Sequence, residues 1–170
     1  MDIITCRTII WQQFGAAIDM LDDALGACPD ELWREPVWDD PSDLPEYTQF
    51  WFVLYHSLFW LDLYLSGSEE GFAPPAPFKR GQLPEKPYTK GELQTYLDAC
   101  RQKCQATMET LTGEAAQRRC RFEWGEISFA ELQLYNMRHV QEHAAQLSLV
   151  LGQKGISAPD WVVKARDRAA

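Results

Sequence analysis

The sequence lacks a surplus of positive charge, because its 170 residues carry 16 Lys and Arg against 25 Asp and Glu, a formal net charge of −9. Nucleic acids and anionic membrane surfaces bind proteins through a cationic face, so we expect neither as the main partner. Long apolar runs are missing too. The most apolar stretch, Phe50 to Leu65, is interrupted by His56 and Asp62 and is shorter than the roughly 20 residues of a membrane-spanning helix. The N-terminus shows neither a basic leader nor a small-residue cleavage site. These absences predict a soluble cytoplasmic protein.

Several common site motifs are also absent. The five cysteines are an odd number without a CxxC pair, which argues against a disulfide framework and against a zinc knuckle. Cys100 and Cys104 share a helical spacing; we interpret them as small core residues, with a thiol pair or soft metal ligands as the alternative. No P-loop or GxGxxG occurs. No Ser–His–Asp or Cys–His nucleophile arrangement is evident either.

Apolar residues at helical spacing are abundant and mark four segments of the chain. The segments run from about Asp2 to Cys28, from Pro45 to Leu65, from Thr89 until Gly113, and from Ser128 to about Leu151. The last two open with the S/T-x-x-E pattern of a capping box. No segment with strand periodicity is comparable in strength. We therefore predict an all-α fold, a four-helix bundle that forms a single domain over residues 1–170.

Two connections refine this prediction. Residues 66–88 are rich in Gly, Pro and Ser and far exceed the roughly 2–8 residues that join antiparallel neighbours in a bundle. This length permits a crossover, with the second and third helices parallel. After Pro159 we expect a short C-terminal helix in DWVVKARDR, with Trp161 docked on the bundle.

The arginines in RRCR, residues 118–121, are interpreted as part of a solvated loop; the alternative is that they bind an anionic substrate.

Histidine is scarce, and its three positions form a pattern. His139 and His143 lie four residues apart in a stretch without Gly or Pro, so both side chains share one helix face, with Cβ atoms about 5–6 Å apart. His56 lies in the apolar segment FVLYHSLFW, where an unpaired imidazole needs a partner. Histidine nitrogens bind zinc at about 2.0–2.1 Å, so residues at this spacing can reach one ion. We predict a metal site formed by His56, His139 and His143; the alternative is a pair of polar residues hydrogen-bonded on a partly exposed helix.

A polar stripe supports the metal prediction. Asn136, His139, His143 and Gln146 follow a 3-4-3 spacing beside an apolar stripe of the same rhythm. Polar groups against an apolar face destabilise a bundle unless they face water or a site. Bundles build metal sites from side chains that project inward from facing helices.

These motifs resemble those of the DinB-like (DinB/YfiT) superfamily, whose members are regarded as metalloenzymes. The resemblance rests on His56 in YHSLFWLDLYLSG and on His139, His143 and Gln146 in RHVQEHAAQLSLVLGQKG, and it spans nearly the whole chain. It implies a divalent transition metal, Ni or Zn first and Fe next, held by three neutral imidazoles with positions open for water or a small-molecule substrate. Relatives that act as thiol-dependent transferases or isomerases imply a low-molecular-weight thiol as co-substrate. The resemblance names no particular substrate.

Two other functions remain open. The residues His139-Val-Gln-Glu142-His143 match the HxxEH signature of a metal-dependent hydrolase, in which Glu142 would be the general base. Only 27 residues follow His143 to provide the downstream carboxylate ligand of that class, and a solvated surface acid is the simpler interpretation of Glu142. The second alternative is a non-catalytic bundle that binds a metal or a small ligand. A broad exposed helix face is compatible with a homodimer.

Overall fold

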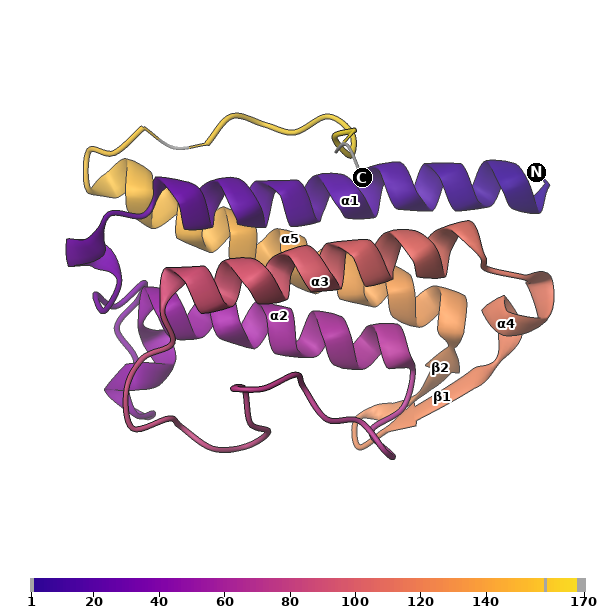
Figure 1. Cartoon of the computed structure of the whole chain (residues 1–170), viewed down its shortest axis with the longest axis horizontal. Helices are drawn as coiled ribbons and strands as arrows, with labels where there is room; N and C mark the ends of the chain where they lie inside the picture. Colours follow the sequence, from indigo (N-terminus) through magenta and orange to yellow (C-terminus); the bar gives the residue numbers. More distant parts are fainter. Residues whose placement is uncertain (1, 158, 168–170) are drawn as a thin grey trace.

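The computed structural model describes residues 2–157 and 159–167 and consists mainly of four long helices (Figure 1). They are α1 (Ile3–Ala27), α2 (Phe50–Ser66), α3 (Lys90–Glu109) and α5 (Phe129–Gln153). Helix α1 packs against α3 and α5, and α2 packs against the same two helices from the other side. The helices thus close a ring around one core, and the predicted four-helix bundle is confirmed.

The direction of the helices confirms the crossover. In Figure 1, α1 and α5 run from right to left, whereas α2 and α3 run from left to right. The long connection from Gly67 to Thr89 returns along the bundle, so that α2 and α3 lie parallel and in contact. Gly67 makes the turn out of α2 with a φ of 75°, a left-handed conformation that glycine adopts without strain.

Local signals in the sequence set most helix ends. Asp2 caps α1 by accepting a hydrogen bond from the Thr5 N–H, and Thr89 and Glu92 form the complete capping box of α3. Ser128 caps α5 by accepting from the Glu131 N–H. The expected second helix is divided, however. A 3₁₀ turn, η2 (Pro45–Thr48), precedes the extended residue Gln49, and α2 begins only at Phe50.

The connection from α3 to α5 contains structure that the sequence analysis did not predict. After α3 ends at Glu109, Gly113 begins a short helix, α4 (Gly113–Gln117), instead of ending the longer one. Strands β1 (Arg119–Phe122) and β2 (Gly125–Ser128) then form an antiparallel hairpin. The cross-strand pair of Arg121 and Glu126 stabilises a register in which Cys120 and Phe122 of β1 are buried and the two arginines of β1 are exposed.

The predicted C-terminal helix is wrong within residues 159–167, which the structure shows as a segment without helix. The segment lies along α1, where the Ala165 N–H donates to the Gln12 carbonyl and the Arg166 N–H donates to the Asp19 carboxylate (Figure 1). These hydrogen bonds to α1 replace those a helix would make within itself. Trp161 does not dock, since 70% of its surface is exposed, and Val162 is buried instead. Arg168, the last residue of the predicted helix, lies outside the described residues.

The core confirms the interpretation of the cysteine pair. Cys100 and Cys104 are free thiols, buried at 1% and 0% exposure among leucines and aromatic side chains. Among the described residues, no helix is both long and apolar enough to cross a membrane.

Candidate metal centre

The three histidines come together between α2 and α5. His56 lies in the middle of α2, and His139 and His143 lie one turn apart on the facing helix, α5. The Nε2 atom of His139 is 3.2 Å from Nε2 of His56 and 3.1 Å from Nε2 of His143. One ligating nitrogen from each residue falls within 4.8 Å of the others. The structure therefore places all three predicted residues in one cluster.

The spacing of these nitrogens fits a single ion. With metal–nitrogen bonds of about 2.0–2.1 Å, two ligands lie about 3.3–3.4 Å apart at a tetrahedral angle and about 2.8–3.0 Å apart at a right angle. The two observed separations lie between these limits. His139 is thus close enough to share one divalent cation with His56 on the facing helix and with His143 on its own helix.

Gln146 sets the tautomer of one histidine. Its side-chain oxygen accepts a hydrogen bond from Nδ1 of His143 at 2.8 Å. A neutral imidazole has one N–H, so this bond leaves the lone pair on Nε2, the atom that faces the cluster. A metal-ligating histidine commonly donates its other N–H in this way, which fixes the ring and increases its basicity.

The cluster is neutral at pH 7. Burial lowers the pKa of His56 to about 4, with a smaller effect from His143. Burial also lowers the pKa of His139 to about 3, with His143 and His56 adding to the shift. Desolvation lowers the pKa of His143 as well, opposed by its hydrogen bond to Gln146 and the charge of Glu142. Neutral imidazole is the form that binds metal ions.

Two amides support the cluster from one side. Asn136 and Gln133 are both fully buried on α5 and donate hydrogen bonds to the carbonyls of Leu61 and Tyr64 on α2. These bonds hold the two helices in register beside the histidines. Gln133 was missed in the sequence analysis, although its position three residues before Asn136 continues the polar stripe.

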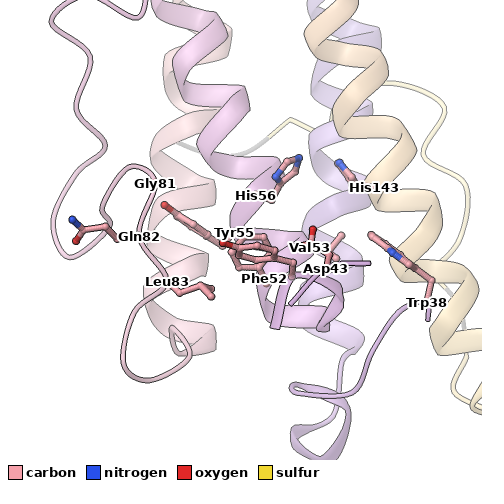
Figure 2. Close-up of a pocket in the computed structure, with 11 residues that line it drawn as sticks. Trp38, Asp43, Phe52, Val53, Tyr55, His56, Gly81, Gln82, Leu83 and His143 are labelled. Carbon is pink, nitrogen blue, oxygen red and sulfur yellow. The ribbon is translucent and has the colours of Figure 1, made fainter. Parts of the chain in front are cut away.

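The cluster opens into a cavity of about 380 Å³ (Figure 2). Figure 2 shows His56 and His143 reaching from α2 and α5 toward the same space. The other walls come from the loop before α2, from the first turns of α2 and from the crossover; they are formed by Trp38, Asp43, Tyr47, Phe52, Val53, Tyr55, Gly81, Gln82 and Leu83. The loop residues were not identified from the sequence, because no local pattern marks which parts of two long loops meet in space.

Other charged candidates lie elsewhere. Glu142 is exposed and does not line the cavity. Arg119 and Arg121 pair with Glu126 across the hairpin, and Arg118 lies over the ring of Phe129, 4.7 Å from its centroid. None of these three arginines lines the cavity, so they do not form an anion grip there.

Comparisons with known proteins agree with the observed fold. The family model of the DinB superfamily matches residues 13–147. No curated protein matches the sequence. The structure is similar to the crystal structure of a DinB-like protein, YjoA, from Bacillus subtilis, with a TM-score of 0.61 and 16% sequence identity over 92% of this chain and 99% of that chain. At this identity, the similarity to YjoA shows a shared fold.

Proposed function

The chain belongs to the DinB superfamily, and from this premise we propose that His56, His139 and His143 bind one divalent transition metal through their Nε2 atoms. The observation that carries the proposal is the pair of Nε2 separations, 3.1 and 3.2 Å, centred on His139. Three nitrogen donors suit Ni, Zn or Fe and suit Mg or Ca poorly, and we propose Ni or Zn first. Three protein ligands leave coordination positions for water or substrate.

The cavity suggests what the centre acts on. Its volume of about 380 Å³ fits a small molecule, and His56 and His143 both line it. We propose that a small-molecule substrate binds there beside the ion. A metal in this position supplies Lewis-acid chemistry, which polarises a bound carbonyl or lowers the pKa of a bound water or thiol.

The cysteines favour a thiol co-substrate over a protein nucleophile. Among the described residues no cysteine lines the cavity, and burial raises the pKa of Cys100 and Cys104. A reaction that needs a thiol at this centre therefore requires one from solution. We propose a metal-dependent transferase or isomerase that uses a low-molecular-weight thiol. Free cysteines throughout the described residues fit a reducing compartment, and we propose the cytoplasm.

The protein's own side chains have limited roles in this proposal. The three imidazoles stay neutral and bind, and Gln146 orients His143 through the Nδ1 hydrogen bond. The hydrophobic walls exclude water from the bound molecule. Glu142, the base that a hydrolase would need, is exposed outside the cavity and is given no part in the reaction.

Elemental analysis of protein purified without chelator tests the metal site. We expect close to one ion per chain in the wild type and in Gln102→Ala, an exposed control on α3, and a strong loss in His56→Ala and His143→Ala. Wild-type metal content in both histidine variants would contradict the site.

The reaction class needs a separate assay. Metal-loaded protein should conjugate an electrophile to a small thiol, and chelation or His139→Ala should abolish turnover. Peptide cleavage lost in Glu142→Gln would instead favour the hydrolase. Saturable binding of the thiol or the electrophile without turnover would favour a non-catalytic metal-binding bundle.

A further inference from the structure

Apart from the histidines, the walls of the cavity combine aromatic side chains with a carboxylate. Four aromatic side chains line it, namely Trp38, Tyr47, Phe52 and Tyr55, together with one carboxylate, Asp43, and among the described residues no Lys or Arg does so. We infer that the cavity binds a small organic cation, with its ammonium group held by the aromatic rings and Asp43. This inference names the substrate class of the proposed function and rests on that function for the claim that the cation is a substrate.

Three of the four aromatic residues form a continuous row. The rings of Tyr47 and Phe52 lie 4.8 Å apart, and Phe52 meets Tyr55 edge to face at 5.9 Å. The Tyr55 hydroxyl donates to the Lys79 carbonyl at 2.8 Å, so its polar atom is occupied by the crossover. Faces of Trp, Tyr and Phe attract cations through their quadrupoles, and several such rings together recognise quaternary ammonium groups.

The carboxylate is held in place beside these rings. One oxygen of Asp43 accepts the Leu44 N–H at 2.8 Å, which orients the side chain. Asp43 lines the cavity, and Figure 2 shows it with Trp38 on one side and the crossover residues Gly81, Gln82 and Leu83 on the other. A carboxylate beside aromatic faces is complementary to a cation and unfavourable to an anion.

The chain that forms one wall of the cavity is negatively charged, like Asp43 itself. Residues 30–46, the loop that carries Trp38 and Asp43, hold one arginine and seven acids, namely Asp30, Glu31, Glu35, Asp39, Asp40, Asp43 and Glu46. The opposite wall has bases next to it in sequence, Lys79 and Arg80, but neither lines the cavity, and Arg80 pairs with Glu69. A surplus of one sign over a cleft raises the local concentration of ligands of the other sign.

The layout also orients the ligand. Phe52 precedes His56 by four residues of α2, which places it about 6 Å away along the helix axis, and Tyr47 lies farther back. The Phe52 ring adjoins the His56 ring, with centroids 6.4 Å apart, and Tyr47 packs on Phe52 with centroids 4.8 Å apart, so the aromatic row begins at the histidines and leads away from them. A cationic head near Tyr47 lies farther from a bound divalent ion than one near Phe52, and the opposite end of the same molecule can present a donor atom to that ion.

The test uses two cationic probes, choline and phenyltrimethylammonium, and the uncharged carbon isostere of choline, 3,3-dimethylbutan-1-ol. Binding to the full chain is measured by calorimetry and by tryptophan fluorescence.

We expect choline to bind about tenfold more tightly than its isostere. Trp38→Leu should weaken choline binding about fivefold. Asp43→Asn should weaken it roughly threefold to fivefold, as for an exposed ion pair. Asp39→Asn is the matched control, because it removes the same charge from the same loop outside the cavity, and it should change affinity less than twofold.

Three results would overturn the inference: no saturable binding of either cation in the millimolar range, equal binding of choline and its isostere, or an effect of Asp39→Asn as large as that of Asp43→Asn. The titrations are repeated on chelated and on metal-loaded protein. Cation binding without metal uptake would contradict the proposed function but leave the cation site in place. Metal uptake with no preference for cations would contradict the cation site but leave the proposed function in place.

Discussion

Two of the buried polar clusters among the described residues differ in how completely their polar atoms are satisfied by hydrogen bonds. Asp19 and Arg101, at 0% and 4% exposure, bind each other through two hydrogen bonds between α1 and α3. The backbone of Arg166 completes the cluster, with its N–H on Asp19 and its carbonyl on Arg101. In the histidine cluster, by contrast, three ring nitrogens face one another, and the buried Nδ1 of His139 has no hydrogen-bond partner among the described residues.

The difference separates a structural cluster from a functional one. A buried ion pair with complementary hydrogen bonds holds elements together and offers nothing to a ligand. Each Nε2 atom of a neutral imidazole carries either a hydrogen or a lone pair, so three Nε2 atoms that face one another cannot all be both donors and acceptors. Because Nδ1 of His143 donates to Gln146, Nε2 of His143 carries a lone pair that is directed at the cluster and available to a cation. The first cluster fixes the C-terminal segment, and the second is suited to binding.

The largest effect is expected from a substitution that breaks the structural cluster of Asp19 and Arg101. Asp19→Asn leaves Arg101 buried without its counter-charge and should lower the free energy of unfolding by about 3–5 kcal/mol, as measured by urea denaturation. The matched control is Asp23→Asn, which removes a carboxylate from the half-exposed pair with Arg166 and should lower it by no more than about 1 kcal/mol. Equal losses in the two variants would show that the buried pair has no special role.

The next largest effect is expected from a substitution in the histidine cluster. His139→Ala removes the nitrogen closest to both others and should weaken metal binding by more than about 100-fold. At a free metal concentration 100 times the dissociation constant, the ion should stabilise the wild type by about 2.7 kcal/mol and the variant hardly at all. Thermal unfolding with and without metal measures this difference. Gln102→Ala, at an exposed position on α3, should behave as the wild type.

A smaller effect concerns the support of His143. Gln146→Leu removes the acceptor of the Nδ1 hydrogen bond, and metal affinity should fall about 10- to 100-fold while all three ligands remain. Competition with a chelator of known affinity measures this change. Gln102→Leu, on the exposed face of α3, serves as the control. An unchanged affinity in Gln146→Leu would mean that the hydrogen bond plays no part in the site.

The last prediction concerns a pH dependence of the metal-free protein. In the unfolded chain the histidines take up protons near their ordinary pKa of about 6.5, whereas in the folded state His56 and His139 do so only near pH 4 and 3. The unfolded state therefore binds more protons below pH 6.5, and the free energy of unfolding falls with decreasing pH, by roughly 1–2 kcal/mol per histidine at about pH 5. Urea denaturation at several pH values measures the slope. His139→Phe should reduce it, and an unchanged slope in this variant would contradict the depressed pKa.

Most of the fold could be predicted from the sequence, because its signals are local. Helix caps such as Asp2, Thr89 and Ser128 act within one turn, and the apolar seams repeat every three or four residues. The hairpin escaped prediction because each strand has only four residues: the alternation of exposed and buried residues in β1 is too short to stand out, and β2 has no fully buried residue. The C-terminal segment has a helical composition, but distant partners on α1, Gln12 and Asp19, take its backbone N–H groups.

The candidate site also has a part that the sequence predicted and a part that it did not. His139, His143 and Gln146 share a helix face, so their spacing alone predicted that they are neighbours, and His56 was the one remaining histidine. The cavity depends instead on how two long loops fold over α2. No local rule brings Trp38 and Leu83 to the same space. The tautomer of His143 likewise required the distance to Gln146.

X-ray absorption spectroscopy of the metal-loaded protein tests the central claim most directly, because it reports the atoms bound to the ion. We expect about three nitrogen neighbours at roughly 2.0–2.1 Å with the multiple-scattering pattern of imidazole, and the remaining positions filled by oxygen. Sulfur neighbours at about 2.3 Å would place the ion on the cysteines. That result, or the signal of a single imidazole, would contradict a centre built from His56, His139 and His143.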